Sequence, residues 1–305
     1  MKILIATVKP FNAKAVEVIK KELESAGHCV QVLEKYASVD ELKENVKDAE
    51  AMIVRSDKIT KEIIDAAPKL KIIVRAGAGY DSIDTAYAKE KGIVIENTPG
   101  QNSNAVAELV FGLLIYMVRS FFSGKSGSEL KGKKLGILAF GNIGRHVARI
   151  ANGFGMEVYG FSRSHAANPT KEDGVQFVAT KEDLYKQCDI VSVHLPANEH
   201  TKQSVGYADV NLMKKDGILV NTARKEVINE PELLRLMEER KDIKFVTDIK
   251  PDADAEFAKF ENRYFSTPKK MGAQTAEANA NAGIAAAKQI NAYFKEGCTK
   301  FQVNK

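Results

Sequence analysis

The chain has 305 residues and a mass of 33.5 kDa, about twice the usual size of one domain, so two domains are expected. Its 44% hydrophobic and 28% charged residues exclude a disordered protein, and its net charge of +5 comes without the basic block that nucleic-acid binding requires. The longest apolar stretch, Ala105–Val118, contains Glu108 and is too short to cross a bilayer, and no signal peptide is evident. We therefore expect a soluble cytoplasmic protein with a small anionic substrate and no nucleic-acid or membrane partner.

The three cysteines are isolated from one another. Cys29, Cys188 and Cys298 form no CxxC pair, which argues against a disulfide framework and against a zinc site. We expect reduced structural thiols and no metal.

From Met1 to Pro99, short apolar runs alternate with amphipathic helices. The runs expected as strands are Met1–Val8, His28–Tyr36, Ala51–Arg55, Leu70–Val74 and Ile93–Ile95. A helix from Ala13 to Ala26, ended by Gly27, and another from Asp40 lie between them. This alternation predicts a parallel sheet built from βαβ units.

The second half of the chain repeats the alternation. A long helix, Asn104–Arg119, is apolar on most faces and should be buried against something larger than its own domain. After a loop, further strands are expected at Lys134–Leu138, Glu157–Ser162, Asp189–Leu195, Gly217–Ala223 and Lys244–Ile249. A helix rich in Ala and Asn runs from Thr275 to about Phe294. The fold class is α/β, with two parallel sheets.

The most informative local motif is LGILAFGNIGRHVARI, from Leu135 to Ile150. It predicts a strand, a glycine-rich turn and a helix whose first N–H groups can bind a pyrophosphate. The fingerprint is incomplete, because Ala139 stands where its first glycine belongs, followed by Gly141 and Gly144. A tight structural turn is therefore the alternative to a dinucleotide site.

The next strand ends without the acidic residue that selects NAD. It ends at Ser162, followed by Arg163 and Ser164. A guanidinium can bind a 2′-phosphate bidentately, and no carboxylate repels the phosphate there, so these residues favour NADP. The alternative is that Arg163 is a solvated surface residue.

Seven motifs in order give the chain a resemblance to the D-2-hydroxyacid dehydrogenases. They are VRSDKIT at Val54, IIVRAGAGYDSID at Ile72, NTPGQNSNAVAE at Asn97, the glycine-rich turn, DIVSVHLP at Asp189, GILVNTAR at Gly217 and TPKKMGAQTAEA at Thr267. The resemblance covers nearly the whole chain and is strongest to the branch that acts on phosphoglycerate.

The resemblance implies two Rossmann-like domains, with a dinucleotide domain inserted in a discontinuous substrate domain. We place the substrate domain at residues 1–98 and 276–305 and the dinucleotide domain at 99–275. The resemblance also implies a homodimer formed through the helix near Asn104, although the segment between Arg119 and Leu130 is shorter than in the family. No C-terminal regulatory domain is expected after Lys305.

Site residues are carried over by position. Arg224 resembles the catalytic arginine, which binds the substrate carboxylate and polarises the ketone. The residues that resemble substrate contacts are Arg55, placed to receive a phosphate, Ser56, Ala76, Gly77 and Asn102. Those that resemble NAD or NADP contacts are Gly141, Asn142, Ile143, Gly144, Ser162, Arg163, Leu195, Pro196, Thr222, Ala223 and Asp248. Asp248 is also explained as a turn residue at a strand end.

The family's acid histidine is missing, since no histidine follows His200. Counting back from Gly272 and Ala273 puts Lys270 in its place, whereas counting from Pro268 puts Lys269 there.

The partner glutamate is missing as well, and its place falls near Asp252 to Asp254. A carboxylate would raise the pKa of a lysine further, whereas burial beside Arg224 would lower it, so the two losses are chemically consistent. We interpret Lys270 as a replacement acid, with a surface lysine as the alternative. We interpret His194 as a strand-end residue rather than an acid.

The expected function is hydride transfer between NAD(P) and a D-2-hydroxy acid, with oxidation of D-3-phosphoglycerate to 3-phosphohydroxypyruvate in serine biosynthesis as the reaction. One alternative is a glyoxylate or hydroxypyruvate reductase, which would not need Arg55. Another is a catalytically silent dinucleotide-sensing protein, suggested by the missing histidine and glutamate.

Overall fold

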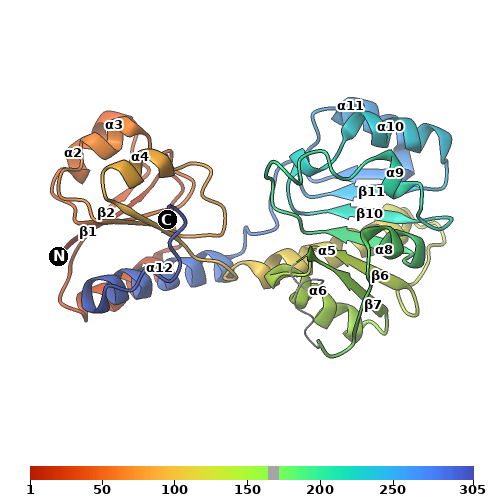
Figure 1. The fold of residues 1–305 in the computed structure, drawn as a ribbon, viewed down its shortest axis with the longest axis horizontal. Coiled ribbons are helices and arrows are strands. Elements are labelled where there is room, and N and C mark those ends of the chain that lie inside the picture. The colour runs from red at the N-terminus through yellow and green to blue at the C-terminus, as the bar shows by residue number, and fades with distance from the viewer. Residues whose placement is uncertain (164–171) are drawn as a thin grey trace. The chain divides into compact units, whose positions relative to one another are not determined.

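A computed structural model describes residues 1–163 and 172–305, which form two compact units (Figure 1). Unit 1 consists of Met1–Asn102 with Gln274–Lys305, and unit 2 of Ser103–Ala273, so unit 2 is inserted in the sequence of unit 1. The division falls at 102/103 and 273/274, against the predicted 98/99 and 275/276. The stretch after residue 96 stays with unit 1 because the Thr98 N–H donates to the Gly77 carbonyl at 3.0 Å and Gln289 Nε2 to the Asn97 carbonyl at 3.0 Å.

Unit 1 contains a five-stranded, all-parallel sheet in the order β2-β1-β3-β4-β5. Its strands are β1 (Lys2–Thr7), β2 (Cys29–Glu34), β3 (Ala51–Val54), β4 (Ile72–Arg75) and β5 (Val94–Asn97). Its helices are α1 (Ala13–Glu24), α2 (Val39–Val46), α3 (Lys61–Asp65), α4 (Thr85–Glu90) and α12 (Ala276–Glu296).

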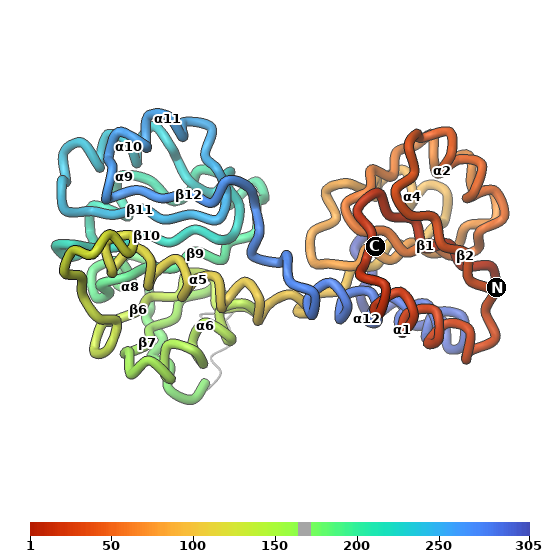
Figure 2. Tube along the Cα trace, turned by 180° about the vertical axis from the view of Figure 1, so that it is seen from behind, coloured from red at the N-terminus to blue at the C-terminus, as the bar shows by residue number. Residues whose placement is uncertain are grey.

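Helices cover both faces of this sheet, as its continuous apolar strands require. On one face Ile3, Ile53 and Ile72 pack against α1 and α12, which lie side by side (Figure 2). On the other face Leu4 and Ile73 pack in the core beneath α2, α3 and α4. Adjacent residues such as Ile3 and Leu4 point to opposite faces, because side chains alternate along a strand.

Unit 2 contains a seven-stranded, all-parallel sheet in the order β12-β11-β10-β9-β6-β7-β8. Its strands are β6 (Lys134–Leu138), β7 (Glu157–Phe161), β8 (Val175–Phe177), β9 (Ile190–Val193), β10 (Ile218–Asn221), β11 (Lys244–Thr247) and β12 (Tyr264–Ser266). Its helices are α5 (Ser103–Val118), α6 (Asn142–Gly153), α8 (Lys181–Gln187), α9 (Tyr207–Val210), α10 (Glu230–Glu239) and α11 (Asp254–Phe257), with short 3-10 segments at Ser120–Phe122, Lys225–Val227 and Ala258–Arg263.

The sheet of unit 2 also has one core on each face. Helices α5 and α6 cover the face with Leu135, Ile137 and Val220, and α8 to α11 cover the face with Leu138 and Leu219. The predicted α/β class with two parallel sheets is therefore confirmed. Strands β8 and β12 were not predicted, because each is only three residues long and sits at a sheet edge.

The helix predicted at Asn104–Arg119 is α5, and its apolar faces pack against α6 and the sheet of unit 2. It ends in a turn where Ser120, Phe121 and Phe122 all have φ between 51° and 56°. Left-handed backbone at non-glycine residues costs about 1–2 kcal/mol each. Within the described residues, no helix combines the length and apolarity that crossing a membrane requires.

Candidate active site

The carboxyl ends of six strands in unit 2 lie in register. The aligned last residues are Phe161, Leu138, Val193, Asn221, Thr247 and Ser266. The residues that follow them, and so line one edge of the sheet, are Ser162, Ala139, His194, Thr222, Asp248 and Thr267. In open α/β sheets, ligands bind outside this edge.

The glycine-rich turn crosses this edge between β6 and α6. Gly141 is the N-cap of α6, and no side chain caps the helix, so its first backbone N–H groups are not used by a cap. Gly144 packs the helix closely on the strand, since a Cβ there would lie 3.0 Å from Ile137 Cγ2. Asn142 is exposed and Ile143 half-buried at the start of the helix. This arrangement fits a pyrophosphate.

Ala139, which replaces the first glycine of the fingerprint, has a φ of +70°. This left-handed conformation costs an L-residue about 1–2 kcal/mol of stability. A glycine avoids that strain, but it costs about 0.5–1 kcal/mol because it has more conformational freedom to lose on folding. We expect Ala139→Gly to raise the free energy of unfolding by up to about 1 kcal/mol. Urea titration of both proteins would measure this, and a less stable variant would show that the left-handed turn is not strained.

The residues expected to choose between cofactors follow β7 directly. Ser162 is half-buried and Arg163 is exposed. Ser164 lies outside the described residues. The acidic side chain expected of an NAD-selective site is replaced at this edge by a hydroxyl and a guanidinium.

His194, Leu195 and Pro196 follow β9. The imidazole of His194 interacts through Nε2 with Ser192 Oγ at 3.0 Å, and burial lowers the pKa of His194 to about 4. A ring with this pKa is neutral at pH 7 and has no proton to give as an imidazolium. Its Nδ1 has no hydrogen-bond partner among the described residues. Leu195 is half-buried and Pro196 exposed, so both side chains can form a wall against a ligand.

Thr222 follows β10 and is 3% exposed. Its Oγ1 is buried and lacks a hydrogen-bond partner within the described part of the chain. Buried hydroxyls without hydrogen-bond partners are uncommon, because a buried polar group that makes no hydrogen bond costs about 1–3 kcal/mol. The residues present therefore fit a bound dinucleotide, with Thr222 and His194 supplying polar atoms and α6 its N-terminus.

Arg224 and Lys270 meet at one backbone carbonyl. Lys270 Nζ donates to the Ala223 carbonyl oxygen at 3.0 Å, and Arg224 Nη1 donates to the same oxygen at 2.9 Å. Both side chains make further interactions. The structure thus brings together the two residues that the sequence analysis interpreted as catalytic, although Lys270 is exposed on its unit rather than buried as expected.

The turn that carries Ala223 and Arg224 is fixed by Asn221. Its Nδ2 donates to the Arg224 carbonyl at 2.9 Å, and its Oδ1 accepts from the Ala223 N–H at 3.0 Å. Asn221 is 1% exposed. A role for Asn221 was not predicted from the sequence, although this residue opens the NTAR motif.

Asp248 binds the loop that carries Lys270. Its carboxylate accepts the backbone N–H of Met271 at 2.9 Å and that of Gly272 at 2.8 Å, and Thr267 Oγ1 lies 3.0 Å from Oδ1. Asp248 is fully buried. Both carboxylate oxygens hold this loop, which fits the alternative of a structural turn residue. The nicotinamide contact that the resemblance implied stays a prediction.

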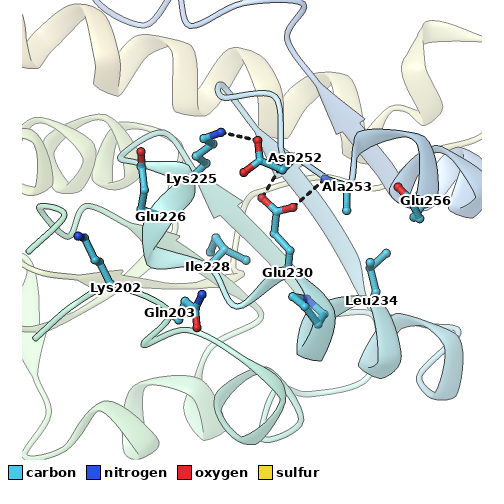
Figure 3. Close-up of a pocket in the computed structure, with 11 residues that line it drawn as sticks. Lys202, Gln203, Lys225, Glu226, Ile228, Glu230, Leu234, Asp252, Ala253 and Glu256 are labelled. Atoms are coloured by element: carbon cyan, nitrogen blue, oxygen red, sulfur yellow. Dashed lines mark hydrogen bonds and ion pairs between the residues drawn. The ribbon is translucent and has the colours of Figure 1, made fainter. Parts of the chain in front are cut away.

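The aspartates near the place of the missing glutamate bind residues outside the candidate active site. Asp252 pairs with Lys225, and Asp254 accepts from Tyr264 Oη at 2.7 Å and pairs with Lys250 at 3.0 Å. An open pocket of about 780 Å³ lies beside this segment, where the Glu230 carboxylate accepts from the backbone of residues 252 and 253 (Figure 3). Both aspartates therefore serve local structure.

In unit 1, the ends of β3 and β4 present the substrate-side residues. Ala76 donates its N–H to the Val54 carbonyl at 2.8 Å, and Gly77 has a φ of +148°. The guanidinium of Arg75 occupies the space that a Cβ at position 77 would fill, with Nη1 only 1.5 Å from that point. Gly77 is therefore required by the close approach of Arg75, a residue that the sequence analysis did not single out.

Arg55 has acceptors of its own. Nη1 donates to the carbonyls of Lys9 and Pro10 at 2.7 Å each, Nη2 donates to Asn279 Oδ1, and the guanidinium stacks 5.0 Å from the Phe11 ring. Burial lowers the pKa of Arg55, which the nearby Asp57 partly offsets. The guanidinium therefore ties the end of β3 to the loop before α1 and to α12.

Ser56 and Asn102 complete the substrate-side set. Ser56 is exposed, and Asn102 is half-buried at the last position before unit 2. Asp57, which was not predicted, is 4% exposed and holds the Ser56 segment by accepting from the N–H groups of Arg55 at 3.0 Å and Val8 at 2.7 Å. Over residues 1–163 and 172–305, no group of three or more His, Cys, Asp or Glu side chains is arranged to hold a metal ion.

Residues 118–268 match a family profile described as the D-isomer specific 2-hydroxyacid dehydrogenase, NAD binding domain. The hydroxypyruvate reductase of Thermotoga maritima is 35% identical over 94% of this chain and 96% of its own length. The D-3-phosphoglycerate dehydrogenase of Methanocaldococcus jannaschii is 34% identical over 87% of this chain, which spans only 53% of that relative's length.

Among solved structures, an NAD⁺-bound 3-phosphoglycerate dehydrogenase of Entamoeba histolytica is 45% identical. The two structures superpose with a TM-score of 0.89, and the match covers 100% of this chain and 99% of the chain in that structure. An acyclic imino acid reductase in complex with NADPH and D-Arg is 27% identical with a TM-score of 0.80. The fold is thus shared with one protein solved with NAD⁺ and another solved with NADPH.

Proposed function

Since the chain belongs to the D-isomer specific 2-hydroxyacid dehydrogenase family, we propose that it transfers a hydride between NAD and D-3-phosphoglycerate, with 3-phosphohydroxypyruvate as the product. The observation that carries the proposal is that two basic side chains, Arg224 and Lys270, meet on the Ala223 carbonyl at the carboxyl edge of the sheet in unit 2. A fixed guanidinium and an amine are suited to binding a 2-hydroxy acid and moving its hydroxyl proton.

In the proposed mechanism, Arg224 binds the substrate carboxylate and polarises the C2 oxygen. The neutral Lys270 amine takes the hydroxyl proton during oxidation and becomes an ammonium group, which returns the proton to the C2 oxygen during reduction. A bound NAD⁺ would supply the acceptor for the hydride that leaves C2. Asp248 holds the loop around Lys270 through Met271 and Gly272, and Asn221 holds the turn around Arg224. Both groups are thus fixed by buried side chains before a substrate binds.

The start of α6 would hold the pyrophosphate of the cofactor, through the backbone around Gly141, Asn142, Ile143 and Gly144. Thr222 and Ala223 would face the nicotinamide, and Leu195 and Pro196 the adenine. The direct test of the proposal is the change in absorbance at 340 nm with purified protein, NAD(H) or NADP(H), and a panel of 2-hydroxy and 2-keto acids. A protein that binds the cofactor but turns over none of them would be a dinucleotide-sensing protein instead.

A glyoxylate or hydroxypyruvate reductase is the second candidate. Two observations favour it: the hydroxypyruvate reductase relative is matched over 96% of its length, and the Arg55 guanidinium already has three acceptors. An unphosphorylated substrate needs no phosphate-binding arginine. The two candidates therefore differ in what Arg55 does.

Under the phosphoglycerate proposal, Arg55→Ala should weaken transition-state binding of the phosphorylated substrate by roughly 2 to 4 kcal/mol and change hydroxypyruvate little. The measurement is kcat/KM for both substrates. Asn279→Ala is the matched control, because it removes one partner of Arg55 and leaves the guanidinium. Equal losses on both substrates would make Arg55 structural and favour the reductase.

We propose that Ser162 and Arg163 give the enzyme affinity for NADP(H) besides NAD(H). One charge-assisted contact to the 2′-phosphate is worth roughly 1.5 to 3 kcal/mol, or about tenfold to a hundredfold in relative affinity. Ser162→Asp should shift the ratio of kcat/KM values toward NAD(H) by at least about tenfold, because its carboxylate repels the phosphate. Arg163→Ala should weaken NADP(H) alone. A wild type that already prefers NAD(H) tenfold would contradict this proposal.

We also propose a cytoplasmic homodimer that serves serine biosynthesis. An aromatic group at the end of α5 supports the dimer: Tyr116 lies 5.0 Å from Phe121, 5.4 Å from Phe122 and 4.9 Å from Phe265, between ring centroids. Phe122 is 67% exposed. Exposed aromatic side chains supported by other rings are typical of protein interfaces.

A further inference from the structure

A small cavity in unit 1 lies apart from every residue assigned above. It has a volume of about 240 Å³ and opens between α12, the end of β5 and the C-terminal segment. Pro99, Ala285, Ala292 and Phe301 give it apolar walls. A water molecule in the liquid occupies about 30 Å³, so the cavity has room for several heavy atoms.

Glu96 lines this cavity and is 1% exposed. Its Oε1 accepts the Phe301 N–H at 3.1 Å, but its Oε2 is buried with no hydrogen-bond partner in the described ranges. Burial raises the pKa of the Glu96 carboxyl, and only the Phe301 N–H opposes this. A buried carboxylate oxygen that lacks a donor is costly, and a donor brought by a ligand would remove that cost.

Gln289 lines the same cavity from α12 and is 9% exposed. Its Nε2 donates to the Asn97 carbonyl at 3.0 Å, which fixes the orientation of the amide, because the opposite orientation would set two oxygens against each other. Its Oε1 therefore remains an acceptor, and it too has no partner among residues 1–163 and 172–305. Two buried residues that line the cavity thus each carry a side-chain oxygen that lacks a donor.

We propose that this cavity binds a small primary alkylammonium ion, with its N–H groups donating to Glu96 and Gln289 and its carbon chain against Pro99, Ala292 and Phe301. The ammonium group supplies up to three donors and one positive charge, which match two acceptors of which one is anionic. Lys288 also lines the cavity, but it is exposed, so solvent screens its charge far more than that of the buried carboxylate. The proposal concerns unit 1 alone and does not depend on the proposed function.

Protonation of Glu96 is the alternative to a bound ammonium ion. If Glu96 is protonated, its own O–H can donate to a neighbouring acceptor and no ligand is needed. The experiment must therefore separate a charged ligand from a neutral one, and it can use a reporter built into the cavity. Cys298 lines the cavity and is partly exposed, whereas Cys188 is buried and Cys29 lies on the surface.

The full-length Cys29→Ser protein would be labelled with a maleimide, and the labelling rate of Cys298 measured with n-butylammonium, n-butanol or butyrate. At ten times its dissociation constant, n-butylammonium should slow labelling about tenfold, while the neutral and anionic probes should leave the rate unchanged. Equal protection by butanol would mean that the cavity takes apolar molecules without regard to charge. Absence of protection by any probe would also overturn the proposal.

Glu96→Gln in the same background removes the charge and keeps the shape, so protection by n-butylammonium should disappear. Glu90→Gln is the matched control, because Glu90 is an exposed carboxylate of the same unit and protection should persist. Full protection in Glu96→Gln would overturn the assignment. If that variant does not fold, Ala292→Leu fills the cavity and leaves Glu96 in place, and calorimetric binding of n-butylammonium to this variant would contradict the proposal.

Discussion

Replacing Lys270 with alanine is expected to lower kcat by about 100-fold or more, because the substrate hydroxyl then has no group to exchange its proton with. Cofactor affinity should stay nearly unchanged, since the residues proposed to hold the cofactor lie on α6 and just after β7, β9 and β10. The measurements are kcat at saturating substrate and cofactor binding by fluorescence titration. Lys270→His restores a group that can carry the proton and should keep part of the activity.

Lys269→Ala is the matched control. Lys269 is exposed, and its carbonyl oxygen lies 3.0 Å from Thr267 Oγ1, whereas the Lys270 amine lies on the Ala223 carbonyl beside Arg224. We therefore expect Lys269→Ala to retain most of the activity. Loss of activity in Lys269→Ala with normal turnover in Lys270→Ala would shift the acid by one position. Normal turnover in both would reject a lysine acid altogether.

Replacing Arg224 with alanine should lower kcat/KM by about 100-fold to 1000-fold, the usual loss when one charged donor to a developing oxyanion is removed. Arg224→Lys keeps the charge but loses the forked geometry that binds a carboxylate through two N–H groups, so it should recover only part of this loss. Steady-state kinetics with the best substrate of the panel would measure both variants.

Arg235→Ala is the control for Arg224. Arg235 lies on α10 of the same unit, its side chain is 66% exposed, and it pairs only locally with Glu239 at 3.1 Å among the described ion pairs. Its removal should leave kcat/KM unchanged. An Arg224→Ala enzyme with normal kcat/KM would show that this guanidinium serves local structure rather than substrate binding.

Some features of the candidate site could be located from the sequence, whereas others depend on contacts that the sequence does not show. The glycine-rich turn could be located from sequence because a turn between a strand and a helix has a local signature. The left-handed φ of +70° at Ala139 came from the structure. A turn role for Asp248 was one of two alternatives from the sequence, but its partners at Met271 and Gly272 could not be predicted, because they are more than twenty residues away in the chain. Arg55 is similar: its acceptors Lys9, Pro10 and Asn279 come from distant segments.

The sequence by itself determined the alternation of strands and helices, the parallel sheets and the position of the dinucleotide turn, because hydrophobic periodicity and turn chemistry are local properties of the chain. It also determined that the usual histidine is absent and which two lysines stand near its place. Only the tertiary structure decided that Lys270 and Arg224 share the Ala223 carbonyl, that Asp252 and Asp254 have other partners, and that Glu96 and Gln289 line one cavity. These relations depend on contacts between segments far apart in the chain and on the register between strands. A shift of one residue along a strand moves its side chains to the opposite face of the sheet.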